Sequence, residues 1–162
     1  MKKMFPLLAL LTLIACKPVD PVEKQIDQLI AQMTLDEKIA QMSQLAADRI
    51  TENIEDQVRA GLGSVLNSMG EDANHYQRIA VEESRLGIPM IFARDVIHGY
   101  RTIYPIPLGQ AATFDLALVE EAARLTAKEA IQAGIRWTFS PMVDISRDPR
   151  WGRIAEGYGE DT

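Results

Sequence analysis

The sequence predicts an α/β fold in which parallel strands alternate with helices. Three short apolar segments have the length and residue types of buried strands, namely residues 62–66, 88–93 and 135–139, and helical patterns separate them. A strand, a helix and a further strand in this order form a right-handed crossover and give a parallel sheet. We therefore expect one parallel sheet of about three strands.

Helices are expected before the first of these strands. The first helix has an apolar stripe made of Val22, Ile26, Leu29, Ile30 and Met33. A second helix begins at a capping box, because Thr34 and Glu37 are spaced so that each side chain accepts a hydrogen bond from the other's backbone N–H. Its apolar face is expected to contain Leu35, Ile39, Met42 and Leu45. A third, short helix covers roughly residues 52–60 and stops at Gly61.

The strands and the remaining helices follow in order. The strand at 62–66 ends at Asn67, and a helix over residues 71–86 stops at Gly87. After the strand at 88–93 comes a long loop that contains Asp95, His98 and Pro105. Thr113 or Asp115 caps a further helix that runs to Ala133, and the strand at 135–139 leads into a polar, glycine-bearing loop over residues 140–162.

The first residues predict a targeting segment. Lys2 and Lys3 precede an apolar stretch over residues 5–15, which is too short to span a bilayer, since spanning takes roughly 20 residues. The stretch ends Leu-Ile-Ala-Cys, which resembles a bacterial lipobox with Cys16 as the lipid-modified residue. We interpret residues 1–15 as a lipoprotein signal peptide, 16–21 as a tether and 22–162 as an incomplete barrel domain. The alternative is an ordinary signal peptide with a free cysteine.

Composition restricts the possible partners. The chain of 162 residues is 47% hydrophobic and 25% charged, with a net charge of −6, which is ordinary for a folded domain. Nucleic-acid binding needs clustered Lys and Arg, and the sequence has no basic run, so no nucleic-acid partner is expected. Cys16 is the only cysteine, which excludes an intrachain disulfide framework. A phosphate-binding parallel barrel is disfavoured because the sequence lacks a glycine-rich phosphate cradle.

The candidate functional residues follow the ends of the predicted strands. They are Asn67, Asp95, His98, Asp144, Asp148 and Arg153. In parallel α/β folds the reactive site is built from the loops at the carboxyl ends of the strands, so these loops are expected to converge on one opening. A carboxylate such as Asp95 can accept hydrogen bonds from neighbouring hydroxyl groups of a sugar, although it could also cap a turn. We interpret His98 as a residue that holds its loop.

The segment 141–153 alternates charges. We interpret Asp144, Arg147, Asp148 and Arg150 mainly as local ion pairs that fix an irregular loop. Gly152 suggests a close backbone approach or a special φ. Arg153 would then present its planar set of donors to a ligand. Trp151 is either a face on which a sugar stacks or a buried anchor of the loop.

Residues 86–114 (LGIPMIFARDVIHGYRTIYPIPLGQAATF) and 134–162 (GIRWTFSPMVDISRDPRWGRIAEGYGEDT) closely resemble glycoside hydrolase family 3, particularly its periplasmic β-glucosidases. The resemblance implies that the three strands are the first part of a TIM-like (β/α)8 barrel. It implies an oligosaccharide or β-glucoside substrate whose hydroxyls are bound by Asp95 and Arg153, and chemistry without a metal or organic cofactor. It also implies supporting roles for Glu156, Glu160 and Asp161.

The resemblance implies no catalytic residue within residues 1–162. The family's Lys-His pair, its nucleophile in a Ser-Asp-Trp-like segment and its acid/base Glu all follow the position of Thr162. We therefore expect the N-terminal part of an exported, periplasmic, retaining glycosidase, held on the membrane by lipidated Cys16. The alternative is a non-enzymatic product with weak sugar binding. β-N-acetylglucosaminidases belong to the same family but have other marker motifs than DPRWGR.

Overall fold

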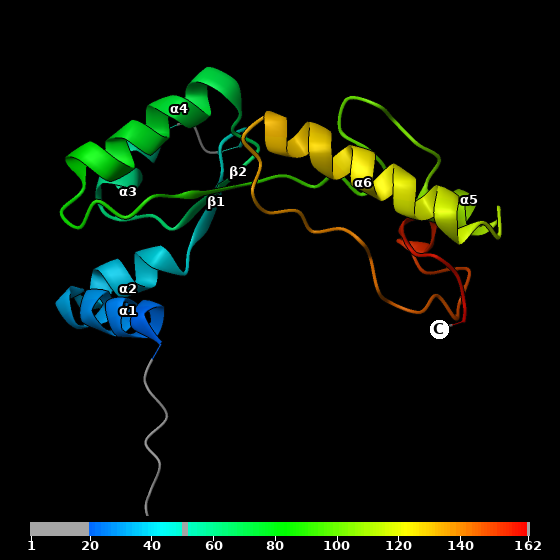
Figure 1. Ribbon diagram of the computed structural model, residues 1–162, viewed down its shortest axis with the longest axis horizontal. Helices are drawn as coiled ribbons and strands as arrows, with labels where there is room; N and C mark the ends of the chain where they lie inside the picture. Colours follow the sequence, from blue (N-terminus) through cyan, green and yellow to red (C-terminus); the bar gives the residue numbers. More distant parts are fainter. Residues whose placement is uncertain (1–19, 50–51, 162) are drawn as a thin grey trace, which may run out of the picture. The chain divides into compact units, whose positions relative to one another are not determined.

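The computed structural model describes residues 20–49 and 52–161 (Figure 1). The chain divides into two units, Met1–Gln32 and Met33–Thr162, which are described separately. The signal peptide predicted for residues 1–15 and the lipidation site predicted at Cys16 lie outside the described residues, as does most of the predicted tether.

The first unit contains helix α1, Pro21–Gln32. Asp20 caps it: its Oδ1 accepts a hydrogen bond from the backbone N–H of Val22 at 2.9 Å, and its carbonyl accepts one from Lys24 at 3.0 Å. Pro21 suits the first helical position because it needs no N–H partner there. The helix predicted from Val22 is confirmed, and it begins one residue earlier, at Pro21.

The second unit contains a three-stranded parallel sheet in the order β1-β2-β3. The strands are β1 (Gln44–Ala46), β2 (Ser64–Leu66) and β3 (Ile91–Ala93). Leu45, Val65 and Phe92 lie beside one another across the sheet. The predicted α/β fold with about three parallel strands is confirmed.

Two of the strand assignments need correction. Leu45 was expected on the apolar face of the second helix, but that helix ends at Gln41, and Leu45 lies in β1. The Ser43 hydroxyl donates to the Ile39 carbonyl at the helix end. The segment 135–139, predicted as a strand, pairs with β3 only at one bridge between Trp137 and Ala93. It therefore lies beside β3 without forming a ladder of its own among the described residues.

The helices of the second unit are α2 (Leu35–Gln41), α3 (Ile54–Arg59), α4 (Gly70–Arg78), the π-helical turn η1 (Ile79–Glu83), α5 (Pro107–Ala111), α6 (Leu116–Gln132) and the 3₁₀ turn η2 (Ile154–Glu156). The predicted capping box at α2 is present, and Asp115 caps α6 by accepting from the N–H of Leu118 at 3.0 Å. The helix predicted for 71–86 is shorter, because it changes to the π-helical turn. Helix α5, which has a proline at its start, was not predicted.

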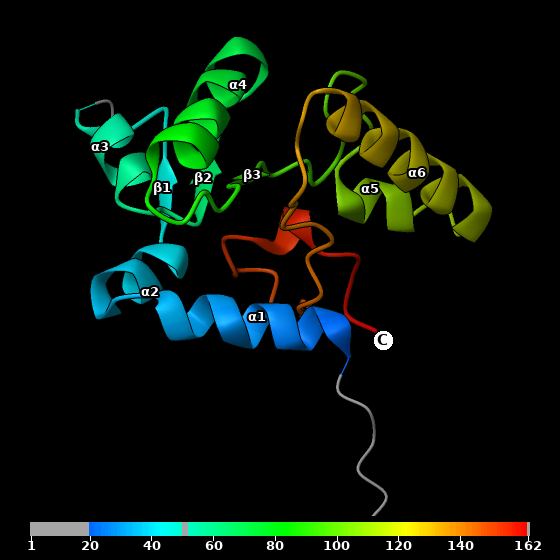
Figure 2. The same cartoon turned by 60° about the vertical axis from the view of Figure 1, so that its left-hand side comes forward.

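The main core lies between the sheet and the helices α3 and α4, which both lie beside the strands (Figure 2). Its most deeply buried side chains are Val58, Val65 and Ile79. A second, smaller cluster joins Val96, Ala130 and Ile135, and so connects the loop after β3 to the end of α6. This second cluster fixes the loop on which the candidate site depends.

Much apolar surface of the second unit stays open to solvent. Leu116 on α6 is 87% exposed and Val143 in the following loop is 82% exposed, and Trp137 and Phe139 are exposed as well. In the described part of the chain, no helix has both the length and the apolar character that crossing a bilayer requires.

Candidate functional site

The loops that carry the candidate residues leave the sheet side by side. The backbone N–H of Arg94 donates to the Trp137 carbonyl at 3.0 Å, so the chain after β3 and the chain after residue 137 start from adjacent positions. Farther along, α5 from the first loop contacts η2 from the second. Two segments far apart in sequence therefore meet beyond the carboxyl end of β3.

Asn67 and Asp48 extend this arrangement across the sheet. Asn67 follows β2 with a left-handed φ of 61°, and its side-chain amide donates to Asp48, which follows β1, at 3.1 Å. Asparagine tolerates this backbone conformation better than most residues. The predicted convergence of polar residues at the strand ends thus includes Asp48, which the sequence analysis did not single out.

Asp95 lies two residues after β3 and is exposed. Its Oδ1 accepts a hydrogen bond from the backbone N–H of Ile97 at 3.2 Å, which is the turn-capping role considered for it. No donor within residues 20–49 and 52–161 reaches its Oδ2. The carboxylate is therefore oriented through one oxygen and can accept ligand hydroxyls through the other.

Arg153 immediately precedes η2, and its side chain is half exposed. Its Nε and Nη2 both donate to one oxygen of Glu156, at 3.0 and 2.6 Å. No described residue accepts a hydrogen bond from its Nη1. The supporting role that the resemblance implied for Glu156 agrees with these two bonds.

The charge of Asp95 acts on Arg153. The pKa of Arg153 is raised above its ordinary value, chiefly by its hydrogen bonds to Glu156, and further by the negative charges of Glu156, Asp144 and Asp95. A joint role of Asp95 and Arg153 in binding a sugar stays a prediction.

His98 holds its loop, as predicted. Its Nδ1 lies 3.1 Å from the Tyr104 carbonyl, and its own carbonyl accepts a hydrogen bond from the Tyr104 N–H at 2.8 Å. Arg94 also contributes, because its guanidinium lies 5.8 Å from the centre of the Tyr100 ring in a cation–π contact. The His98–Tyr104 contacts and the Arg94–Tyr100 contact together close the segment that follows Asp95.

The charged segment 141–153 contains one local ion pair with side-chain hydrogen bonds. Arg150 binds Asp148 through Nε and Nη2, with a shortest distance of 2.6 Å, and its backbone N–H donates to the same carboxylate. This pairing lowers the pKa of Asp148, first through the side-chain hydrogen bond. The ion-pair interpretation is confirmed for these two residues. Asp144 instead acts on Arg153, and no carboxylate in the described part of the chain pairs with Arg147.

The interpretation of Gly152 was wrong. Its φ is not positive, and a Cβ built at this position would meet no atom within 4 Å. The structure therefore gives no steric reason for glycine at this position. Trp151 is half-buried, and its backbone N–H donates to the Asp148 carbonyl, which fits the loop-anchor alternative.

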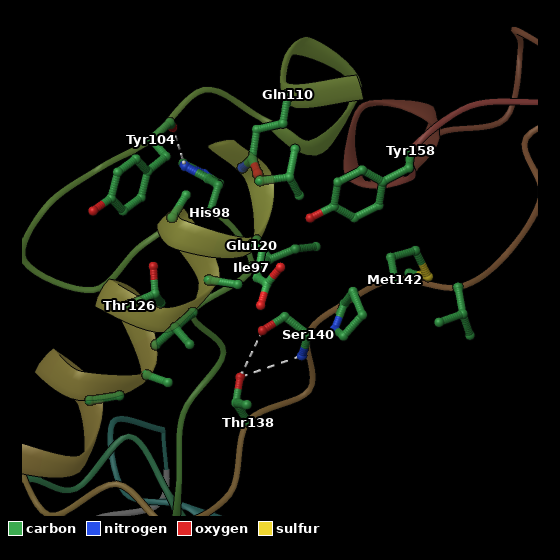
Figure 3. Close-up of a pocket in the computed structure, with 18 of the residues that line it drawn as sticks. Ile97, His98, Tyr104, Gln110, Glu120, Thr126, Thr138, Ser140, Met142 and Tyr158 are labelled. Atoms are coloured by element: carbon green, nitrogen blue, oxygen red, sulfur yellow. Dashed lines mark hydrogen bonds between the residues drawn. The ribbon is translucent and has the colours of Figure 1, made fainter. Parts of the chain in front are cut away.

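A cavity of about 940 Å³ lies between α6, the loop after β3 and the segment 135–145. Its walls are mainly apolar, with polar groups from Gln110, Glu120 and Tyr158, which Figure 3 shows around the same space. Neither Asp95 nor Arg153 lines it. The candidate residues His98 and Asp144 do line it, together with the exposed apolar residues Trp137 and Val143.

No group of three or more His, Cys, Asp or Glu side chains in the described residues is arranged to hold a metal ion. The chemistry of the candidate residues is that of hydroxyl recognition, since a carboxylate accepts and a guanidinium donates.

Residues 34–162 match the glycosyl hydrolase family 3 N terminal domain. The chain belongs to glycosyl hydrolase family 3. Among curated proteins, it is 43% identical over 141 residues to the "Periplasmic beta-glucosidase" of Salmonella typhimurium. This match covers 85% of this chain and 18% of the Salmonella protein. It is 33% identical over 168 residues to the "Lysosomal beta glucosidase" of Dictyostelium discoideum, covering 84% of this chain and 20% of the relative. The chain thus spans about a fifth of the length of these relatives.

Solved family 3 structures agree with the fold. The β-glucosidase from Listeria innocua in complex with isofagomine superposes with a TM-score of 0.77 at 43% identity, over 86% of this chain and 20% of that one. The exo-1,3/1,4-β-glucanase from a Pseudoalteromonas species gives a TM-score of 0.76 at 35% identity, over 88% of this chain and 20% of that one. The N-terminal domain of these enzymes is a TIM barrel, so the prediction that the sheet is the first part of a TIM-like (β/α)8 barrel is confirmed.

Proposed function

We propose that this chain is the N-terminal part of the barrel of a β-glucosidase-type hydrolase that removes terminal β-linked glucosyl or similar residues from oligosaccharides. The observation that carries the proposal is the family 3 match over residues 34–162, together with relatives named β-glucosidase. A β-xylosidase of Formosa agariphila is also 32% identical over 152 residues, so the proposal covers sugars similar to glucose.

In this function Asp95 and Arg153 bind hydroxyls of the terminal sugar. Within the described residues, Oδ2 of Asp95 is a free acceptor and Nη1 of Arg153 is a free donor. The negative charge of Asp95 also contributes to the raised pKa of Arg153, which supports a joint role. A retaining mechanism requires two carboxyl groups about 5–5.5 Å apart, one as nucleophile and one as acid/base. We assign neither role to a residue within 1–162.

We further propose that the protein is exported to the periplasm and anchored by a lipid on Cys16. The order of charges and apolar residues in 1–16 supports this, and the Salmonella relative is named periplasmic. The substitution Cys16→Ser should move the protein from the membrane fraction to the soluble periplasmic fraction. It should also abolish labelling by radioactive palmitate. Unchanged membrane association and labelling of the variant would exclude this anchor.

The test of the binding residues uses the full-length enzyme that contains this chain. Asp95→Ala and Arg153→Ala should each weaken competitive inhibition by glucose and lower kcat/KM for a chromogenic β-glucoside by roughly ten- to a hundredfold, the range expected for a lost charged hydrogen bond. Arg150→Ala is the matched control, because Arg150 lies in the same loop but pairs only with Asp148 in the described structure. Near-wild-type kinetics for either test variant would remove that residue from the site.

The alternative function, a sugar-binding product without turnover, is tested by the same assay. Residues 1–162 expressed alone should hydrolyse no chromogenic β-glucoside, whereas the full-length enzyme should. Hydrolysis by the 162-residue chain would show that a catalytic pair lies within it. Binding of glucose without turnover by the full-length protein would favour the alternative.

A further inference from the structure

Glu129, near the end of α6, makes contacts that the function described above does not use. Its Oε2 accepts hydrogen bonds from the backbone N–H groups of Arg101 and Thr102, both at 2.9 Å, and its Oε1 accepts one from the Thr102 hydroxyl at 2.7 Å. One carboxylate thus holds two consecutive residues of a loop that lies 27 and 28 positions away in the sequence.

The loop that it holds is a closed unit, residues 98–104. His98 and Tyr104 are joined by two contacts at its base, and Gly99 bridges to Ile103 within it. The turn is tight, since a Cβ at Gly99 would lie 2.0 Å from the Thr102 carbonyl oxygen. Because the 98–104 loop is closed, holding its tip at Arg101 and Thr102 fixes its position as a whole.

The 98–104 loop in turn borders Asp95. Tyr100 lies under the guanidinium of Arg94, the residue immediately before Asp95, and the intervening Ile97 donates its backbone N–H to the Asp95 carboxylate. A displacement of the 98–104 loop would therefore change the backbone on both sides of Asp95.

We infer that Glu129 is a positioning residue for sugar binding, which acts by clamping the 98–104 loop and thereby setting the place of the Asp95 carboxylate. This inference rests on the proposed function of Asp95. The hydrogen bonds from Thr102 lower the pKa of Glu129, so the carboxylate stays ionised and keeps its full capacity as an acceptor. A small misplacement of a binding group is costly, since about 1 Å can lower catalytic efficiency by roughly a hundredfold.

Kinetics of variants in the full-length enzyme test the inference. Glu129→Ala should raise KM for a chromogenic β-glucoside by roughly tenfold, with a smaller change in kcat, because the placement of the sugar is disturbed rather than the reacting groups. Glu129→Gln should restore KM to within about twofold, because its carbonyl can accept both N–H groups and the Thr102 hydroxyl can accept from its amide. Glu121→Ala is the matched control, since Glu121 lies on the same helix but binds Arg124, three residues away.

A double-mutant cycle separates this inference from the proposed function. If Glu129 acts through Asp95, then Asp95→Ala with Glu129→Ala should be no worse than Asp95→Ala alone. Should Glu129→Ala fail to fold, Thr102→Val takes its place in the cycle, with a smaller increase in KM that is likewise absent beside Asp95→Ala. This inference alone would be overturned if the effects of Asp95→Ala and Glu129→Ala multiplied in the double variant. An unchanged KM for the folded Glu129→Ala variant would overturn it as well. Wild-type kinetics for Asp95→Ala would overturn the proposed role of Asp95 and this inference with it.

Discussion

Arg153 donates two hydrogen bonds to a single oxygen of Glu156, through Nε at 3.0 Å and Nη2 at 2.6 Å. The two residues lie three apart at the start and end of the 3₁₀ turn η2, so the turn itself sets their separation. This arrangement fixes the plane of the guanidinium and leaves Nη1 as the group that points away from the pair. Given the proposed role of Arg153 in sugar binding, we expect Glu156 to affect ligand binding through the orientation of Arg153.

Glu156→Ala should therefore weaken substrate binding by roughly tenfold, because Arg153 loses the partner that fixes its planar donors. The measurement is KM for a chromogenic β-glucoside in the full-length enzyme. Asp148→Ala serves as the control, since it removes the comparable ion pair with Arg150 from the same loop. Equal effects of the two substitutions would mean that the loop as a whole, and not the orientation of Arg153, determines binding.

Glu37 should make stability depend on pH in the acid range. Hydrogen bonds from Arg85, and then from the Thr34 N–H, lower the pKa of Glu37 from 4.5 to about 2. A carboxyl whose folded pKa is lowered stabilises the fold above its unfolded pKa and loses that contribution as the pH falls through the folded pKa. The melting temperature of the full-length protein should thus fall between pH 4.5 and about 2.

Glu37→Gln should reduce stability at neutral pH and flatten the acid-range dependence, because glutamine carries no charge to lose. The control is Asp36→Asn, which changes the neighbouring carboxylate in the first turn of α2. Thermal unfolding at several pH values from the acid range to neutrality measures both. The prediction fails if Glu37→Gln keeps the wild-type slope.

Gly99 and Gly152 should respond differently to alanine. Gly99 has a φ of 127° and no room for a Cβ, so Gly99→Ala should disrupt the 98–104 loop, lower the melting temperature and raise KM. Gly152→Ala adds a methyl group in open space. It should leave the melting temperature within about 1 °C of the wild-type value, because a surface substitution that meets no other atom changes stability little. A destabilising Gly152→Ala together with a neutral Gly99→Ala would contradict the described backbone.

Residues 20–162 alone should self-associate through their apolar surface. Leu116 and Val143 are among the most exposed large apolar side chains, and extended apolar surface of this kind promotes association. Replacing both by glutamate should shift the species seen in sedimentation velocity toward the monomer. The control is the pair Glu52→Gln and Glu71→Gln, which changes two exposed polar positions and should leave the distribution unchanged.

Local signals in the sequence predicted those elements whose determinants lie within a few residues. The capping box of Thr34 and Glu37 and the cap at Asp115 involve partners three positions apart, and both are present. Strand β1 was missed because Gln44–Ala46 is only three residues long and is a strand only through its pairing with β2, which comes much later in the chain. The segment 135–139 was assigned too much structure for the converse reason, since its composition suits a strand but only Trp137 pairs.

In the candidate site, too, residues marked by a local motif were predicted, and a residue whose partners are distant in sequence was not. Asp95 and Arg153 stood out through their motifs, and His98 through its place in a loop, whereas Glu129 resembles any charged residue on a solvent-facing helix. Its role depends on Arg101 and Thr102, which are distant in sequence and contribute mainly backbone groups that carry no residue-specific signal. Such contacts become visible only when the loop is folded against α6.

The strands of the sheet stand in space in the order in which they occur in the chain, with the Trp137 bridge next after β3. Each newly synthesised strand therefore finds its neighbour already present at a single growing edge, and none has to be inserted between earlier ones. Such an order allows the polypeptide to acquire structure progressively as it leaves a ribosome or a translocation channel, beginning with its N-terminal end.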